Sequence, residues 1–323
     1  MSEIPVYSDL PVADGVHHSW GIWGQEDRLG TLNHITPEAV LRGLGCARQG
    51  KVFSLNLDMA IPGPPLFERP QMTHEIVETA GGALNDIVSS WNTQNSSQWD
   101  GFRHATWPGH GHYNGLGGEL HGVDHWSRHP IVTRAVLLDL ARERAKWGTP
   151  VRPDRSDLIE AADLRRAMRE ADISVERGDV LLIRTGWLQW YLTQDSEARA
   201  RMADRTRLVA PGLAGREEMA ELLWDLGVAG VAADNPSLEA WPPGSHLGAE
   251  ERTIVRADPA RRHEASLHIR VLAGLGIPIG ELWDLESLAE DCADDGRYTM
   301  CLTSAPINLA HGAATPANAI AVK

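Results

Sequence analysis

An uninterrupted apolar run between two charged residues constrains this chain more than any other feature. Val180-Leu181-Leu182-Ile183 lies between Asp179 and Arg184, and a glycine flanks the segment on each side. Such a run, bounded by turn residues, is typical of a strand that is buried on both faces. The segment 133–140 shows the same pattern. We therefore predict two buried strands, the first of which ends at a glycine where a site could lie.

Helical and strand patterns alternate along the chain after about residue 130. Apolar residues recur at helical spacing in four segments, 157–171, 211–226, 265–275 and 285–293. Short apolar runs between them predict further strands, at 228–233, 277–282 and 297–303. This alternation is typical of an α/β fold.

The N-terminal third is poorer in regular patterns. Thr36 as N-cap and Pro37 at the first helical position predict a helix that runs to about Leu44. No repeat, low-complexity segment or linker divides the chain. We therefore predict an N-terminal arm over residues 1–37 and a single α/β domain over residues 38–323.

Composition and charge exclude several classes of protein. The chain has 323 residues, of which 42% are hydrophobic and 23% charged, a mixture typical of globular proteins rather than disordered ones. The formal net charge of −14 argues against nucleic acid as a partner, because phosphate binding requires basic patches.

Cysteine usage and hydropathy indicate the compartment. Cys46, Cys292 and Cys301 are odd in number and far apart, which predicts free thiols rather than disulfides or a zinc ribbon. Met1 to Asp14 lacks a basic segment followed by an apolar run, so no signal peptide is expected. No apolar stretch approaches the ~20 residues of a membrane helix. We expect a cytoplasmic protein that does not contact a membrane.

The most promising candidate for chemistry is the polar stretch from Gln94 to His104. It holds a carboxylate, Asp100, and an imidazole, His104, four residues apart, and a run rich in glycine, histidine and tryptophan follows. Long apolar periodicity is missing, so the stretch is hard to explain as core. An aspartate beside a histidine can form a general base, although such pairs also occur by chance.

Two further groups of residues could take part. His104, His110 and His112 lie within nine residues of one another, a density that could ligate a divalent metal or could mark an exposed loop. His268, on a predicted helix, and Glu281, on the next strand, can meet in space, although each alone is more often a structural polar residue.

Twelve tryptophans against three phenylalanines is an unusual ratio. Large aromatic side chains more often fill a core, but tryptophans can also form a flat aromatic pocket. Several lie in polar, glycine-containing contexts: Trp20, Trp23, Trp91, Trp99, Trp107 and Trp126. Other site types lack support, because the chain has no Gly-x-Ser-x-Gly elbow, and its Gly115–Gly118 run does not connect a predicted strand to a helix as a dinucleotide-binding loop would.

Motifs spread along most of the chain resemble the putative cyclase family, which includes kynurenine formamidases and isatin hydrolases. The matching segments, most similar to the longer bacterial members, are Trp23-Gly24, Asp27, Leu29 to Asn33, Gly50 to Leu55, Tyr113-Asn114-Gly115, Gly178 to Trp187, Ala210 to Leu213, Ala233 to Pro236, Leu267-His268, Glu281 and Ala305 to Ile307. The resemblance implies a swivelling β/β/α cyclase-like fold. It also implies a homodimer or homotetramer with sites near subunit contacts, which the arm with Trp20 and Trp23 could reach.

The family motif His-x-Gly-Thr-His-x-Asp-x-Pro-x-His aligns without a gap on Gln94 to His104. In metal-dependent members the first two histidines and the aspartate bind Zn or Mn, and the last histidine is the catalytic acid or base. Asp100 and His104 match this motif, whereas Gln94 and Gln98 replace the two metal-binding histidines. His268 and Glu281 match the histidine and glutamate that complete the family's metal site.

Two hypotheses follow from these replacements, because an amide oxygen is a weaker ligand than an imidazole nitrogen. In the preferred hypothesis the enzyme uses no metal: His104 is the general base, Asp100 orients it, and Gln98 polarises the substrate. In the other, Asp100, His268 and Glu281 hold Mn or Zn.

The resemblance implies a hydrolase that acts on an amide, a cyclic amide or imide, or a lactone of a small aromatic molecule. Asp100, His104, Gln98, His268 and Glu281 are the predicted catalytic residues. The predicted substrate-binding residues are Gln94, Trp99, Trp23, Trp107, Tyr113 and Asn114. Two alternatives stay open: a cyclase or dehydratase that uses the same site, and a small-molecule binding protein without activity.

Overall fold

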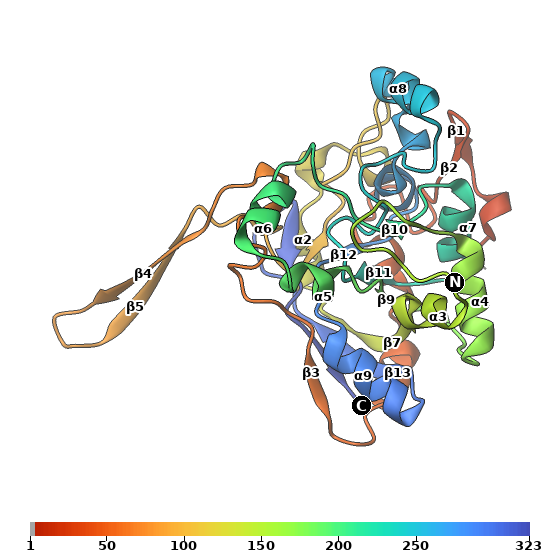
Figure 1. Ribbon diagram of the computed structural model, residues 1–323. Coiled ribbons are helices and arrows are strands. Elements are labelled where there is room, and N and C mark those ends of the chain that lie inside the picture. The colour runs from red at the N-terminus through yellow and green to blue at the C-terminus, as the bar shows by residue number, and fades with distance from the viewer. Residues whose placement is uncertain (1–3) are drawn as a thin grey trace.

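A mixed nine-stranded sheet forms the centre of the computed structural model, which describes residues 4–323 (Figure 1). Across the sheet, in spatial order, the strands are β14 (Ala314–Pro316), β6 (Gln98–Asp100), β12 (Ile279–Glu281), β11 (Gly230–Ala233), β9 (Val180–Arg184), β7 (Ile131–Asp139), β13 (Thr299–Ser304), β15 (Ala319–Val322) and β3 (Val52–Ser54). Strands β12, β11, β9 and β7 are parallel, and the strands on both flanks are antiparallel to their neighbours.

The two predicted buried strands lie side by side in this sheet. Val180 to Ile183 in β9 and Ala135 to Leu138 in β7 are almost completely buried. Parallel strands covered on both faces need apolar side chains in both directions, which explains their uninterrupted apolar runs. The predicted α/β fold with a single domain is confirmed.

Helices surround the sheet, and most of the predicted ones are present. The helices are α1 (Pro37–Leu44), α2 (Val123–Ser127), α3 (Leu140–Lys146), α4 (Ala161–Glu170), α5 (Trp187–Leu192), α6 (Ser196–Ala203), α7 (Glu217–Asp225), α8 (Ala249–Ala257) and α9 (Glu286–Asp295). Helix α1 packs on β7 and β13, while α4 contacts α3 and α7. Thr36 caps α1 through a bond from the Ala39 amide to its hydroxyl, as predicted.

Shorter helices connect these elements. The 3₁₀-helices are η1 (Tyr7–Asp9), η2 (Gly30–His34), η3 (Leu66–Glu68), η4 (Tyr113–Gly115), η5 (Gly118–Leu120) and η6 (Pro259–Glu264). The helix predicted over 265–275 is present over residues 267–274, but its last six residues, η7 (Ile269–Gly274), form a π-helix rather than an α-helix. None of the helices described in residues 4–323 is long and apolar enough to cross a membrane.

Two predicted helices begin later than expected, because short strands occupy their first residues. Strand β8 (Leu158–Ile159) precedes α4 and pairs in parallel with β10 (Gly212–Leu213), which precedes α7. Gly212 is required here, because a Cβ at this position would collide with the backbone of Glu239. This contact anchors the loop after β11, which carries Glu239.

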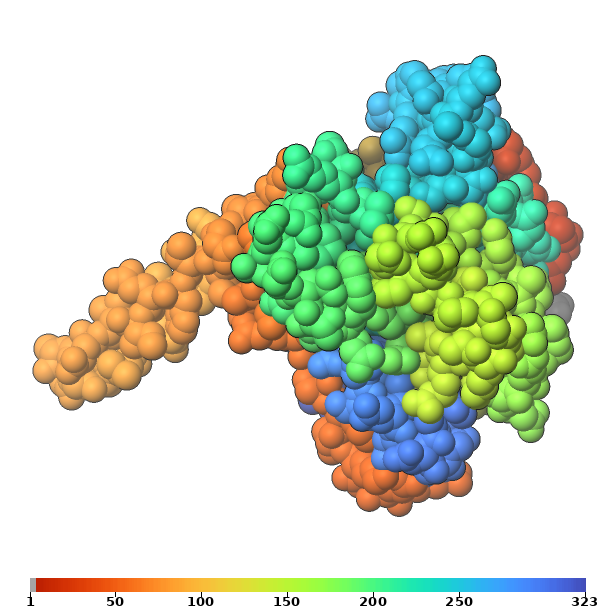
Figure 2. Space-filling model, in the orientation of Figure 1, coloured from red at the N-terminus to blue at the C-terminus, as the bar shows by residue number. Residues whose placement is uncertain are grey.

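A β-hairpin projects from the body of the molecule (Figures 1 and 2). Strands β4 (Thr73–Glu78) and β5 (Leu84–Ser89) pair with each other and with no other strand described in residues 4–323. By contrast, the short hairpin of β1 (Val12–Ala13) and β2 (Val16–His17) belongs to an N-terminal segment that packs on the domain through the buried Tyr7 and Val16. The three cysteines are free, as predicted.

Candidate active site

The pairing of β6 with β12 brings three polar side chains to one face of the sheet. Gln98 lies directly opposite Glu281, and its side-chain amide donates to the Glu281 carboxylate at 2.5 Å. Asp100 is two residues further along β6, so it points to the same side as Gln98, whereas Trp99 points to the other. Asp100 and Gln98 are completely buried.

His268 lies at the centre of three carboxylates. Its Nδ1 is 3.1 Å from Glu239, and its Nε2 is 3.2 Å from Glu281 and 3.7 Å from Asp100. Burial lowers the pKa of His268, but the three surrounding carboxylates, two of which are hydrogen-bonded to its ring, outweigh this effect and hold the pKa well above its ordinary value. This arrangement favours the protonated form of His268.

Gln94 connects Asp100 and His104. Its side-chain nitrogen lies 2.5 Å from Oδ1 of Asp100 and 3.0 Å from Nδ1 of His104. Because the carboxylate can only accept, the Gln94 amide must present its NH₂ group to both partners, and Nδ1 of His104 is then an acceptor. A neutral His104 therefore carries its proton on Nε2, which lies 3.8 Å from Oδ2 of Asp100. This tautomer is a hydrogen-bond donor.

The ionisable groups of the site have pKa values that differ strongly. The pKa of Asp100 is lowered, because the charges of His104 and His268 outweigh its burial. Burial, together with the charge of Asp100, raises the pKa of Glu281 to about 7. Asp100 raises the pKa of His104, but burial and nearby cations outweigh it, so this pKa lies below its ordinary value. Separated values of this kind are typical of acid–base sites.

His104, His268 and Glu281 border a cavity of about 560 Å³, a size that suits a small molecule. Gln94, His104, His268 and Glu281 line its acidic end, together with Glu239. The remaining lining residues are Phe67, Arg69, Ala105, Thr106, Pro108, Arg205, Pro236, Ser237, Trp241, Pro243, Arg262, Ser266 and Ile269.

The donor atoms of the site fit a divalent cation. One ligand atom each from Asp100, His104 and His268 lies within 4.8 Å of the others. Oδ2 of Asp100 and Oε1 of Gln98 are buried, and neither has a hydrogen-bond partner in the part of the chain that the structure describes. Glu281, which the sequence placed in this ligand set, is 3.2 Å from His268. A cation bound here would have to displace the proton of His268, and that of Nε2 of His104.

The structure places the predicted aromatic residues away from this cavity. Trp99 packs in the core against Trp283, and Trp107 is buried in a separate small cluster. The Trp23 ring packs edge-on against Trp224. The aromatic wall of the cavity comes instead from Phe67 and Trp241.

Tyr113 and Asn114 also lie outside the cavity lining, where they fasten the N-terminal segment. The Tyr113 hydroxyl donates to Asp27 at 3.0 Å, and the Asn114 amide contacts the backbone of Gly21 and Gly24. Trp20 likewise donates to a carbonyl of its own chain. These contacts give Tyr113, Asn114 and Trp20 a structural role.

The histidine cluster suggested by the sequence is dispersed. His110 is 2.7 Å from Asp14, and Nδ1 of His112 faces the backbone carbonyls of Phe102 and Ala105. Of the three histidines, His104 alone is among the residues that line the cavity.

Two residues of the site, Glu239 and Arg69, were not predicted. Glu239 accepts from the Leu267 backbone and contacts Nδ1 of His268, so it positions this ring. Arg69 donates to the backbone carbonyl of Gln94. Both come from loops, and only the fold brings them to β6 and β12; the position of Glu239, six residues after the expected end of the strand over 228–233, was the one available hint.

Comparisons with known proteins agree with this architecture. The family model described as "Putative cyclase" matches residues 32–240. A solved structure described as a novel cyclase is 29% identical, with a TM-score of 0.78, and the match covers 95% of this chain and 99% of that one. Isatin hydrolase A from Ralstonia solanacearum is 16% identical, with a TM-score of 0.56 and coverage of 89% and 98%. Isatin hydrolase A from Labrenzia aggregata is 15% identical, with a TM-score of 0.55 and coverage of 84% and 93%. The comparison with curated proteins gave no match.

Proposed function

Because the chain belongs to the putative cyclase family, we propose that it is a hydrolase that opens an amide, cyclic amide, imide or lactone bond in a small aromatic molecule. One observation carries this proposal: the imidazoles of His104 and His268 and the carboxylate of Glu281 meet at one end of the cavity, beside the buried Asp100. Acyl hydrolysis needs a proton acceptor for the attacking water and donors for the developing oxyanion.

Glu281 is the proposed general base. A carboxylate with a pKa of about 7 is half ionised at neutral pH, so it can take a proton from water and return it to the leaving nitrogen or oxygen. Asp100, whose pKa is lowered, is the weaker base and serves as a fixed negative charge. This assignment moves the base role from His104, as the sequence suggested, to Glu281.

His104 and His268 are the proposed electrophilic groups. The contact from Gln94 leaves His104 with an N–H on Nε2, and a neutral imidazole N–H can stabilise an oxyanion by hydrogen bonding. His268, held by Glu239, adds a positive charge close by. The structure does not favour the predicted role of Gln98, which was to polarise the substrate. Its NH₂ group donates a hydrogen bond to Glu281, and only its carbonyl oxygen has no hydrogen-bond partner among the described residues.

Asp100, His104 and His268 are the residues that would hold a divalent cation, with the carbonyl oxygen of Gln98 beside them. When bound, such a cation would act as a Lewis acid toward the substrate carbonyl. The preference for a metal-independent enzyme stays a prediction, which metal analysis of protein purified without added metal, followed by chelation and assay, will decide.

Incubation with N-formylanilines, isatins, cyclic imides and lactones tests the proposed reaction. Hydrolysis adds one water to the product mass, whereas cyclisation and dehydration do not. We expect His104→Ala to lose about 10²–10³-fold in kcat, the effect of removing one oxyanion donor. The exposed His129 offers the matched control, His129→Ala, which should leave turnover unchanged. Absence of turnover across the panel, with tight retention of a ligand, would instead favour a binding protein.

We also propose that the protein forms a homodimer or homotetramer, and that the cytoplasm is its compartment. The β4–β5 hairpin supports self-association, because Ile76 and Leu84 are 60% and 65% exposed on an element that pairs only with itself among residues 4–323. Light scattering on the full chain and on an Ile76→Asp variant tests this. A monomer at micromolar concentration for the unaltered chain would contradict the proposal.

A further inference from the structure

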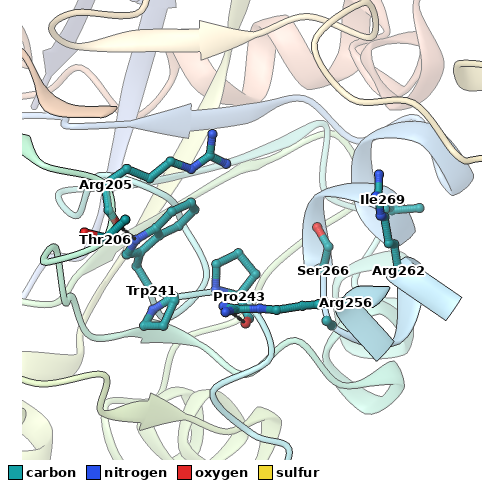
Figure 3. A pocket seen from close by; sticks show the side chains of 10 residues that line it. Arg205, Thr206, Trp241, Pro243, Arg256, Arg262, Ser266 and Ile269 are labelled. Carbon is teal, nitrogen blue, oxygen red and sulfur yellow. Dashed lines mark hydrogen bonds between the residues drawn. The ribbon is translucent and has the colours of Figure 1, made fainter. Parts of the chain in front are cut away.

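The catalytic cavity continues into a second lobe of about 530 Å³. Figure 3 shows the residues that line the second lobe. Six residues line both spaces, so they form one continuous surface: Arg205, Trp241, Pro243, Arg262, Ser266 and Ile269. The second lobe adds Arg256 and Thr206, among others, and contains no carboxylate among its lining residues. We call this space the arginine lobe.

Three arginines from separate elements converge on the arginine lobe. Arg205 follows α6, Arg256 lies near the end of α8, and Arg262 lies in η6. Figure 3 shows all three around the same space, with Arg205 above Trp241. In the described residues 4–323, none of the three forms an ion pair with a carboxylate, although the chain carries 44 acidic residues against 30 basic ones. Unpaired cations gathered in an acidic protein indicate a local need for positive charge.

Two of these arginines, Arg205 and Arg256, repel each other. Burial lowers the pKa of Arg256, and the charges of Arg252 and Arg205 lower it further. An anion placed among Arg205, Arg256 and Arg262 would relieve this repulsion. Guanidinium groups bind carboxylate, sulfonate and phosphate groups in a bidentate manner, which gives direction as well as affinity.

Trp241 supplies an aromatic surface between the two lobes. The Arg205 guanidinium lies 5.3 Å from its ring centroid, and the Phe67 ring packs edge-on against it at 4.9 Å. A flat ring that contacts Trp241 would therefore have the arginine lobe on one side and the acidic end of the catalytic cavity on the other.

We propose that the substrate is an aromatic amide or lactone whose ring bears an anionic group, a carboxylate in the simplest case, and that Arg205, Arg256 and Arg262 bind this group. The three arginines fix the orientation of the substrate, because they hold its anionic group in the arginine lobe and so direct the scissile bond to His104 and Glu281. At the other end the carboxylates of Asp100, Glu239 and Glu281 are offset in part by Arg69 and by the protonated His268, so their repulsion of the anionic group adds less. This inference rests on the proposed hydrolase function for its second half, while the anion preference stands on its own.

Binding to the unaltered protein tests the anion preference without turnover. Naphthoate and naphthalenemethanol have the same ring system and no hydrolysable bond, and calorimetry gives the affinity of each. We expect naphthoate to bind at least tenfold more tightly, and increasing salt concentration to reduce the difference. Arg256→Gln and Arg262→Gln should each reduce naphthoate affinity about tenfold and leave naphthalenemethanol affinity unchanged.

Arg201→Gln is the matched control, because Arg201 lies on α6, pairs with Glu197 and is not among the residues lining either lobe. Equal affinities for the two probes, or a preference that survives Arg256→Gln and Arg262→Gln together, would overturn the anion site.

Turnover tests the second half of the inference. N-formylanilines with a ring carboxylate or a ring hydroxymethyl group form the matched pair, and the carboxylate should have the higher kcat/KM. The Arg256→Gln and Arg262→Gln variants should lose this advantage mainly through KM. If neither compound is hydrolysed, the hydrolase proposal fails while the binding result stands. If both are hydrolysed equally, the assignment of the anionic substrate fails and the hydrolase proposal survives.

Discussion

Replacing Glu281 with glutamine removes the proposed base and leaves the shape of the site. Glu281 is 3% exposed, accepts from Gln98 and contacts His268. Glutamine has the same size but only one acceptor oxygen, so it can accept from Gln98 only if its NH₂ group faces Nε2 of His268, which must then be unprotonated. With this change at His268, we expect Glu281→Gln to fold and to lose about 10²–10⁴-fold in kcat, the usual contribution of a positioned base.

The same variant has a pH-dependent effect on stability whose sign follows from the raised pKa. The pKa of Glu281 is about 7 in the folded protein and 4.5 in the reference state, so the folded state binds more protons between these values. The free energy of unfolding of the unaltered protein then falls as the pH rises from 4.5 to 7. At 1.36 kcal/mol per pH unit, the loss approaches about 3 kcal/mol. Glutamine does not titrate, so the variant escapes this loss. The free energy of unfolding of Glu281→Gln, relative to that of the unaltered protein, should therefore rise by about this much from pH 4 to pH 8.

Urea unfolding at pH 4 and pH 8, on protein treated with chelator, measures the difference in unfolding free energy between the variant and the unaltered protein. The dependence of kcat/KM on pH measures the pKa of the catalytic base. The unaltered enzyme should gain activity as the pH rises through about 7, a limb that the variant should lack. The exposed Glu290 on α9 offers a matched control, Glu290→Gln. An activity limb that persists in Glu281→Gln, or a stability difference that does not change with pH, would refute the reasoning.

Three further predictions concern the metal, the fold and the core. If the site binds a cation, adding Zn²⁺ or Mn²⁺ to chelator-treated protein should raise its Tm in thermal scans. The Asp100→Asn variant should not show this increase. Burial lowers the pKa of His34 to about 3, so the folded state binds fewer protons below pH 6.5 and stability falls toward acid. The loss should reach about 2 kcal/mol at pH 5, and acid titration of a His34→Leu variant should lack it. Trp99→Ala should lower the free energy of unfolding in urea by about 3–5 kcal/mol, because Trp99 fills the core. A small loss of stability combined with weaker substrate binding would instead indicate that Trp99 lines the cavity.

Local sequence was sufficient where one segment determines its own structure. The apolar runs of β7 and β9 predicted central strands, and Thr36 with Pro37 predicted the start of α1. The β4–β5 hairpin was missed, although Gly81-Gly82 between two segments with β-branched residues is a typical hairpin pattern. The starts of α4 and α7 depended on a pairing between β8 and β10, which are more than fifty residues apart and carry no local pattern.

The sequence predicted part of the candidate site, namely the residues that a motif can identify, but not the contacts between them. The motif alignment selected Asp100, His104, His268 and Glu281, and the fold brings these four residues together. It could not show that Gln94 determines the tautomer of His104, since this depends on two distances that no spacing encodes. The aromatic predictions depended on composition, and composition does not distinguish Trp99, which alternation along β6 directs into the core, from Trp241, which borders the cavity.

The projecting β4–β5 hairpin can open locally while the rest of the protein stays folded. Its six residue pairs join only β4 to β5, so separating these strands leaves the nine-stranded sheet intact. Amide hydrogens of the hairpin should therefore exchange with solvent far faster than those of β9, which require global unfolding. If copies of the chain assemble over the hairpin, its exchange will slow as protein concentration increases. The hairpin thus provides a local reporter of assembly that does not depend on knowing the substrate.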